Sequence, residues 1–239
     1  MDQMSWLENC ARRFRLDGVE LLDSHFPSAD DEYLLRVKKA CCDLGLSIYG
    51  LAVSNNFTCA DEDRGNQEEA ARRWIDAAAV LGAPAIRVFA GMASGLSADG
   101  MLGKCVASLA ASAAAAAERG ITLGLENHGG LSADQAVRLM DDVGSPHLRM
   151  VLDTGNFPDD ALGSIEKTAS RAVYVHAKTY AFDGAGNETR LPYERIIEIL
   201  EASGFNGYLS IEFEGDGDEI AEVGKSVDLL RRCTSWRRK

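Results

Sequence analysis

The chain has 239 residues, of which 46% are hydrophobic and 26% charged, so it can bury a sizeable core as one domain over residues 1–239. Its formal net charge of −12 disfavours nucleic-acid and anionic-membrane partners, because the long-range field repels both. The N-terminal MDQMSWLENC is acidic and polar, unlike a secretory signal, and the apolar run at 110–117 is too short to span a bilayer. We therefore expect a cytoplasmic protein.

Strand and helix patterns alternate along the whole chain. A helix pattern at 2–14 comes first, and strand patterns follow at Gly18–Leu22, 46–53, Ala85–Phe89, Thr122–Glu126, 149–153, 173–177 and 208–213. Amphipathic helix patterns occupy 31–44, 66–81, 98–119, 132–143, 159–170, 192–203 and 217–233. Such regular alternation predicts a parallel sheet covered by helices, and the length suits a TIM-type (β/α) barrel.

The patterns give seven strands, one fewer than a closed eight-stranded barrel needs. The first strand is the one lacking, because the helix pattern at 2–14 leads directly into the strand at Gly18–Leu22. Either the true start lies upstream, or the barrel has a gap where its first strand belongs. A gap would expose strand edges and core, which is a stability problem.

Four metal-binding side-chain types stand at the ends of four successive strand patterns: Glu126, Asp153, His176 and Glu212. Parallel strands joined by helices return to the same end of the sheet, so the four side chains should meet at one rim. Three carboxylates and one imidazole suit a divalent ion such as Mn²⁺, Mg²⁺, Co²⁺ or Zn²⁺. The sequence therefore predicts a metal-dependent enzyme.

The two-residue alternation of each strand supports this interpretation. Large aliphatic residues occupy the face opposite each candidate ligand: Leu123 and Leu125, Met150 and Leu152, Val173 and Val175, and Leu209 and Ile211. Any one of the four candidates, taken alone, is more simply a buried group paired within the core. Four candidates in the same phase favour a shared site.

Five segments, GVELLDSHFP, LGLENHGG, VLDTGNF, VHAKTY and LSIEFEG, resemble in their order the xylose-isomerase-like TIM barrels. That superfamily includes sugar phosphate isomerases and epimerases, ketose 3-epimerases, inosose dehydratases and apurinic endonucleases. The resemblance implies that Glu126, Asp153, His176 and Glu212 hold a single metal ion. It also implies that Glu126 and Glu212 act as acid/base groups on opposite faces of the substrate, and that pairing of outer helices can form a homo-oligomer.

The expected activity is that of a sugar or polyol isomerase or epimerase. A metal ion that chelates the carbonyl and hydroxyl oxygens stabilises an enediolate, while a glutamate removes the proton beside the carbonyl and a second can return it. An inosose-type dehydratase shares the first step and stays open. An endonuclease-like phosphodiesterase is less expected, because AVSNNF, IRVFAG and TGNF lack the histidines that the resemblance would require. Because the first strand is lacking, a non-catalytic sugar-binding barrel is a further alternative, although the presence of all four ligands argues against it.

Further rim residues are candidates for substrate binding: His25, Arg87, His128, Asn156 and Lys178. His128 contacts substrate hydroxyls or fixes the loop backbone, and Lys178 binds a phosphate or carboxylate or forms a rim salt bridge. Asn156 stands where the resembling epimerases and endonucleases usually carry histidine. Arg87 and Glu20 both stand at strand positions that face the barrel interior. We therefore expect a buried Glu20–Arg87 pair, with substrate binding by Arg87 as the second interpretation.

Overall fold

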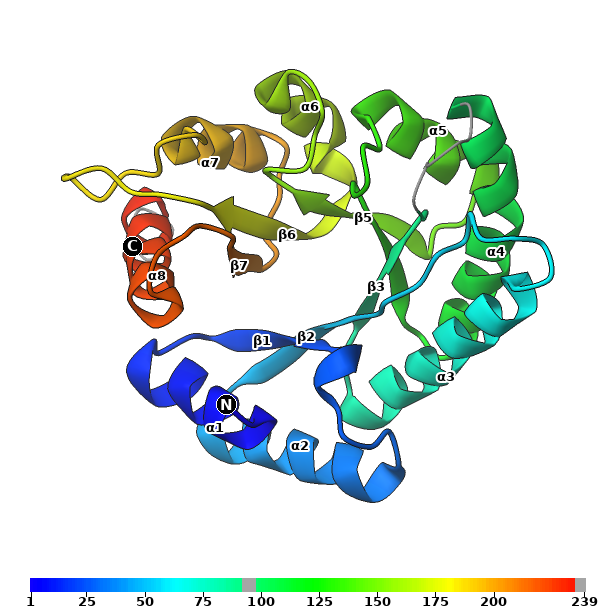
Figure 1. The fold of residues 1–239 in the computed structure, drawn as a ribbon, viewed down its shortest axis with the longest axis horizontal. Coiled ribbons are helices and arrows are strands. Elements are labelled where there is room, and N and C mark those ends of the chain that lie inside the picture. Colours follow the sequence, from blue (N-terminus) through cyan, green and yellow to red (C-terminus); the bar gives the residue numbers. More distant parts are fainter. Residues whose placement is uncertain (92–97, 235–239) are drawn as a thin grey trace.

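Seven parallel strands form one sheet in the computed structural model, which describes residues 1–91 and 98–234. The strands are β1 (Gly18–Leu22), β2 (Ser47–Ala52), β3 (Ala85–Phe89), β4 (Thr122–Glu126), β5 (Leu148–Asp153), β6 (Ala172–Thr179) and β7 (Leu209–Phe213), and they pair in chain order (Figure 1). The sheet curls into a nearly closed barrel with helices outside it. The predicted TIM-type barrel of seven strands is confirmed.

Helices alternate with the strands along the chain and form the outer layer. They are α1 (Gln3–Glu8), α2 (Asp31–Leu44), α3 (Arg64–Leu81), α4 (Ala98–Glu118), α5 (Ala133–Val143), α6 (Ala161–Thr168), α7 (Tyr193–Ala202) and α8 (Glu219–Cys233). A π-helical turn, η1 (Asn9–Arg13), continues α1, and short 3-10 turns are η2 (Asp23–His25) and η3 (Ala169–Arg171). Local chemistry sets several ends: Ser132 and Gln135 form a capping box at α5, and Gly144 ends that helix in the left-handed conformation.

The packing layer between strands and helices is apolar, as the alternation predicts. Leu123, Leu125, Met150 and Leu152 are fully buried, because their phase points towards the helices. Gly124 faces the interior, where a Cβ would lie 2.5 Å from Val151 Cγ2, so only glycine leaves room for that side chain. Within the described ranges, none of the helices combines the length and apolar character that crossing a bilayer requires.

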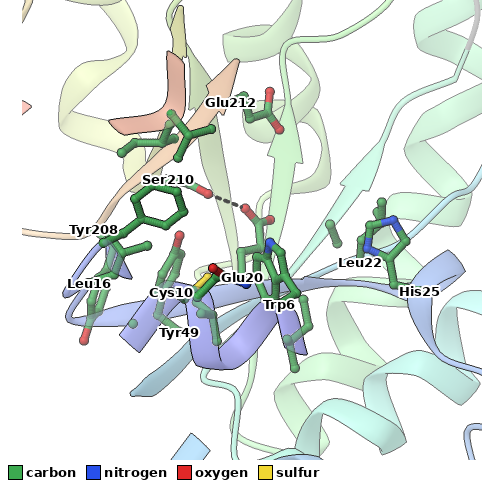
Figure 2. Close-up of a pocket in the computed structure, with 18 of the residues that line it drawn as sticks. Trp6, Cys10, Leu16, Glu20, Leu22, His25, Tyr49, Tyr208, Ser210 and Glu212 are labelled. Carbon is green, nitrogen blue, oxygen red and sulfur yellow. Dashed lines mark hydrogen bonds between the residues drawn. The ribbon is translucent and has the colours of Figure 1, made fainter. Parts of the chain in front are cut away.

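The barrel is open between β1 and β7. Among the described strands, β1 pairs only with β2 and β7 only with β6. A cleft of about 1280 Å³ separates the two strands, and α1, η1 and α8 contribute to its walls (Figure 2). The predicted gap is therefore present, and the cleft reaches the barrel interior at Glu20, Arg87 and Glu212.

Candidate functional site

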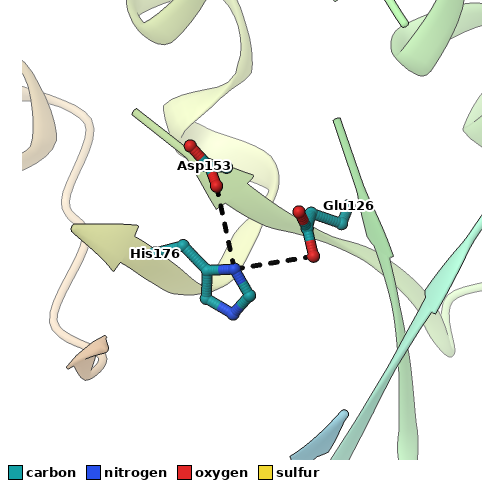
Figure 3. A group of neighbouring side chains, drawn as sticks. All are labelled: Glu126, Asp153 and His176. Carbon is teal, nitrogen blue, oxygen red and sulfur yellow. Dashed lines mark ion pairs between the residues drawn. The ribbon is translucent and has the colours of Figure 1, made fainter. Parts of the chain in front are cut away.

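Three of the predicted ligands meet at the carboxyl ends of adjacent strands (Figure 3). Glu126 ends β4, Asp153 ends β5, and His176 lies beside Asp153 in the register of β6. His176 Nδ1 lies 3.5 Å from Glu126 Oε2 and 4.0 Å from Asp153 Oδ2, and one ligand atom from each residue falls within 4.8 Å of the others. All three side chains are buried.

The atoms that face the middle of this group fit a metal ion. Glu126 Oε2 and His176 Nδ1 are buried and have no hydrogen-bond partner among the described residues. Arg87 Nε lies 3.0 Å from Glu126 Oε2 but is not oriented to donate a hydrogen bond to it. Buried polar atoms are costly when unsatisfied, and a divalent ion accepts lone pairs from both atoms. Glu126, Asp153 and His176 could therefore hold a metal ion.

Glu212, the fourth predicted ligand, approaches from β7 on the other side of His176. Its Oε1 lies 3.2 Å from His176 Nδ1, and its Oε2 lies 3.2 Å from Lys178 Nζ. The side chain is 32% exposed, whereas that of Glu126 is 4% exposed. Glu212 thus lies at the border of the three-residue group and lines the open cleft.

Lys178 is surrounded by carboxylates. Its Nζ lies 3.0 Å from Asp153 Oδ2 and 2.8 Å from Glu214 Oε1, in addition to Glu212. It also donates to Asn156 Oδ1 at 3.2 Å. Burial opposes the charge of the ammonium group, but Asp153 and Glu212 outweigh burial and raise the pKa of Lys178. The lysine is therefore a charged member of the cluster, engaged by protein oxygens.

The ionisation of the cluster follows from burial and neighbouring charge. Burial raises the pKa of Asp153 to about 6, against the opposing effect of Lys178. Burial also opposes the charge of Glu126, but a hydrogen bond from His128 and the charge of His176 leave the pKa of Glu126 below its usual value. Burial disfavours a charged His176, yet Glu20 and the nearby glutamates raise the pKa of His176 to about 10.

The predicted Glu20–Arg87 pair is wrong. Arg87 pairs with Glu126 and donates from Nη1 to the Val53 carbonyl oxygen at 3.0 Å. The reason is the sheet order, because β3 lies next to β4. Glu20 points into the interior beside the open cleft and contacts His176, with Nε2 and Oε2 2.8 Å apart.

The remaining rim candidates divide into two groups. His128 and Asn156 border the carboxylates: His128 Nδ1 lies 3.5 Å from Glu126 Oε1, and Asn156 donates to Asp153 Oδ2 at 2.9 Å and to Glu126 Oε1 at 3.2 Å. His25 lies in η2 and lines the cleft instead, away from Glu20 and Glu212 (Figure 2). The structure thus brings two of these three residues to the cluster.

Asn127 is a site residue that the sequence analysis missed. Its side chain is fully buried, accepts a hydrogen bond from the Asp153 backbone N–H at 2.7 Å and donates to the Asp153 carbonyl oxygen at 2.8 Å. This pair of bonds links the ends of β4 and β5, and so places Glu126 relative to Asp153. The available signal was a polar residue in the phase that Leu123 and Leu125 occupy.

Comparison with known proteins places this barrel among relatives. A family model described as "Xylose isomerase-like TIM barrel" matches residues 11–233. Among solved structures, a xylose isomerase domain protein from Planctomyces limnophilus superposes with a TM-score of 0.82 and 18% identity, covering 96% of this chain and 91% of the other.

Two further solved structures were determined with a sugar or a metal ion. The D-psicose 3-epimerase of Clostridium cellulolyticum H10, solved with D-tagatose, has a TM-score of 0.78 and 18% identity over 100% of this chain and 93% of the other. A xylose isomerase-like TIM barrel protein of Mycobacterium smegmatis, solved with magnesium, has a TM-score of 0.73 and 19% identity over 97% and 87%. Identities this low show a shared fold.

One curated relative matches over a short segment. The C-glycoside deglycosidase alpha subunit of Arthrobacter globiformis is 38% identical over 68 residues, which are 28% of this chain and 19% of that protein. The match therefore spans about a fifth of the relative's length.

Proposed function

Because the chain belongs to the xylose isomerase-like TIM barrel family, we propose that it is a divalent-metal-dependent isomerase or epimerase of sugars or polyols. The observation that carries the proposal is the buried group of Glu126, Asp153 and His176, with two inward-facing atoms that have no hydrogen-bond partner among the described residues. A sugar-binding barrel without chemistry would have no need for such a group.

Glu126, Asp153, His176 and Glu212 would hold the ion. Three oxygen donors and one nitrogen donor fit Mn²⁺, Mg²⁺, Co²⁺ or Zn²⁺. When bound, the ion supplies Lewis-acid polarisation of the substrate carbonyl. Two basic side chains would supply positive charge next to the carboxylates: Arg87 beside Glu126, and Lys178 beside Asp153 and Glu212.

Two glutamates serve as the proton-transfer groups. Glu126 and Glu212 approach His176 Nδ1 from different strands, at 3.5 and 3.2 Å, so a sugar bound at this point lies between two carboxylates. Removal of the proton beside the carbonyl by one glutamate leaves an enediolate. Return of a proton by the other glutamate on the opposite face yields the epimer, and return at the neighbouring carbon yields the isomer.

The substrate that we propose is a small ketose or a ring ketone derived from a polyol. Support comes from the fold neighbour that was solved with a ketose, and from the net charge of −12, which disfavours nucleic acid. His128 and Asn156 border the carboxylates and would contact the substrate hydroxyls. His25 and Arg87 would act from the cleft side, and the site of action would be cytoplasmic.

A second candidate is an elimination reaction that begins with the same proton abstraction. The observation that favours it is the 38% identity over 68 residues with a C-glycoside deglycosidase subunit. After the proton beside the carbonyl is removed, expulsion of a group from the next carbon gives an unsaturated ketone. Water is the leaving group in a dehydratase of the inosose type. The two candidates differ only in the fate of the enediolate.

The test is hydrogen exchange at the substrate in D₂O. Protein loaded with Mn²⁺, Mg²⁺, Co²⁺ or Zn²⁺ is incubated with a panel of ketoses and inososes, and NMR follows deuterium at the carbon beside the carbonyl. We expect deuterated epimer or isomer from at least one sugar, and a loss of about 10²-fold or more in Glu126→Gln and Glu212→Gln.

The control and the contrary outcomes are equally specific. Glu201→Gln changes an exposed carboxylate on α7 and should leave the rate unchanged. An unsaturated product in place of an epimer would select the elimination. Absence of divalent-ion binding by the parent protein, or equal rates in parent and both glutamate variants, would refute the proposed function.

A further inference from the structure

Glu20 is a buried carboxylate at the centre of a hydrogen-bond network inside the barrel. It lies on β1, where Val19 and Leu21 face the helices and Glu20 faces the interior. Its side chain is 10% exposed. It comes from the far side of the open cleft, so its contacts with β6 and β7 cross the gap in the sheet (Figure 2).

Three side chains contact this carboxylate. Tyr174 Oη donates to Oε1 at 2.7 Å, Ser210 Oγ donates to Oε2 at 2.9 Å, and His176 Nε2 lies 2.8 Å from Oε2. An ionised carboxylate only accepts hydrogen bonds, so the hydrogen between it and the imidazole belongs to His176 Nε2. Tyr174 and Ser210 bind the same carboxylate from β6 and β7.

The bond at Nε2 determines what the other ring nitrogen can do. With a hydrogen fixed on Nε2, Nδ1 is the nitrogen that presents a lone pair when the ring is neutral. Nδ1 is also the atom directed at Glu126 and Asp153, and it is buried with no hydrogen-bond partner among the described residues. Glu20 thus contacts Nε2, the ring nitrogen of His176 that points away from Glu126 and Asp153.

We infer that Glu20 is the positioning residue of the metal-binding histidine, fixing the tautomer and the ring orientation of His176 through Nε2. In many proteins this task is performed by a carboxylate that accepts a hydrogen bond from the histidine nitrogen that does not bind the metal. Loss of that carboxylate typically weakens metal binding 10- to 100-fold. The inference rests on the proposed metal site, and it adds a residue from β1 that touches neither the ion nor the substrate.

A purely structural role is the competing explanation. Glu20 also ties β1 to β6 and β7 across the open cleft. Tyr174→Phe and Ser210→Ala remove the other two bonds of this tie and leave the carboxylate–imidazole contact in place. Comparison of these variants with Glu20→Gln separates the support of His176 from the support of the sheet.

Metal affinity is the first measurement. Calorimetric titration of ion-free protein with Co²⁺ should show binding about 10- to 100-fold weaker in Glu20→Gln than in the parent, with the visible Co²⁺ spectrum altered. We expect changes below about threefold in Tyr174→Phe and Ser210→Ala, since the Glu20 contact with Nε2 remains in both. Equal affinity in parent and Glu20→Gln, or equal weakening in all three variants, would overturn the inference.

A second measurement needs no metal. In ¹⁵N-histidine-labelled, ion-free protein, the His176 Nε2 proton should resonate downfield and exchange slowly with water. It should shift upfield and exchange faster in Glu20→Gln, but not in Ser210→Ala. If Glu20→Gln does not fold, Glu20→Asp takes its place. This variant keeps the negative charge but shortens the side chain by one methylene, which moves the carboxylate away from Nε2, and it should give the same changes. If the parent binds no Co²⁺, the proposed function fails, and the Nε2 proton still decides the role of Glu20.

Discussion

Two glutamates of the same chemistry meet different surroundings in this barrel. Glu126 is buried beside Arg87 and His128, whereas Glu212 is partly exposed beside Lys178 and lines the open cleft. Burial opposes the charge of Glu126, and its basic neighbours nevertheless keep its pKa below the usual value. The two proton-transfer groups of the proposed reaction are therefore not interchangeable.

Proton release on metal binding is the first residue-scale prediction. Burial opposes a charged His176, but Glu20 raises the pKa of His176 to about 10, so the ion-free ring is protonated at pH 8. An ion can bind Nδ1 only after that proton leaves. We expect about one proton to be released per ion at pH 8, measured by calorimetry in buffers of different ionisation enthalpy.

His176→Asn is the matched control for that prediction, because asparagine has no proton to lose in this range. The buffer dependence of the binding heat should disappear in the variant. Identical heats for the parent protein in all buffers would contradict the prediction, since they mean that no proton moves.

Stability against pH is the second residue-scale prediction. The folded-state pKa of His176 is about 10, above the usual 6.5, so its contribution is present below pH 6.5 and is lost as pH rises towards 10. The folded-state pKa of Glu20 is about 2, because His176 outweighs the effect of burial, so its contribution is present above pH 4.5 and is lost as pH falls towards 2. Urea unfolding of ion-free protein should show both losses.

Both losses have the same main cause, the contact between His176 and Glu20. His176→Asn and Glu20→Gln should therefore each flatten the decline of unfolding free energy in both ranges, between pH 6.5 and 10 and between pH 4.5 and 2. A parent protein whose unfolding free energy stays constant between pH 6.5 and 10 would count against the pairing of His176 with Glu20.

Asn127 has its effect at the scale of strands. Its two hydrogen bonds to the Asp153 backbone fasten the end of β4 to the end of β5, where the hydrogen bonds of the sheet stop. Because both partners are buried, the alternative to these bonds is an unsatisfied peptide group. The spacing of Glu126 and Asp153 therefore depends on a residue that ligates nothing.

Removal of the Asn127 side chain tests this dependence. Asn127→Ala should lower the free energy of unfolding by about 1–3 kcal/mol in urea titrations, because it leaves the backbone N–H and C=O of Asp153 without these hydrogen-bond partners. It should also weaken binding of the divalent ion. Asn206→Ala, at an exposed loop position, should do neither. Unchanged ion affinity in a destabilised Asn127→Ala would restrict the residue to stability.

The elements themselves were largely predictable from the sequence. The strands Gly18–Leu22, Ala85–Phe89 and Thr122–Glu126 have the predicted bounds, because period-two alternation, turn residues and helix caps all indicate the same limits. Parallel connectivity then brought Glu126, Asp153 and His176 to one rim. Contacts across the interior were not predictable: Glu20 meets His176 through barrel curvature, which no local pattern encodes.

At the scale of the whole molecule, the open side of the barrel is bridged by side chains. Tyr49 stacks on Tyr208 with ring centroids 4.2 Å apart, and Arg231 donates to the carbonyl oxygens of Phe14 and Arg15 at 2.8 and 2.7 Å. Together with the bonds of Glu20, these contacts join the two ends of the sheet. Backbone pairing, in contrast, ends at β1 and at β7 in the described part of the chain.

Amide hydrogen exchange should reveal this asymmetry. Strands β3 to β5 are each paired on both sides, so we expect their amides to exchange only when most of the protein unfolds. Amides of β1 and β7 should exchange faster, and those of β7 should be slowed by a bound divalent ion because Glu212 is a proposed ligand. Mass spectrometry of peptides from these five strands measures this difference, and uniform protection around the sheet would contradict it.

The open side also affects what happens to a hydrogen atom taken from a sugar. A proton held by Glu126 is enclosed, whereas a proton held by Glu212 faces the cleft and can trade places with bulk water. Under the proposed reaction, starting sugar recovered after partial conversion should keep its isotopic label when Glu126 is the abstracting group. It should lose that label when Glu212 is. The forward and reverse reactions would then leave different isotopic records in their unconverted sugars.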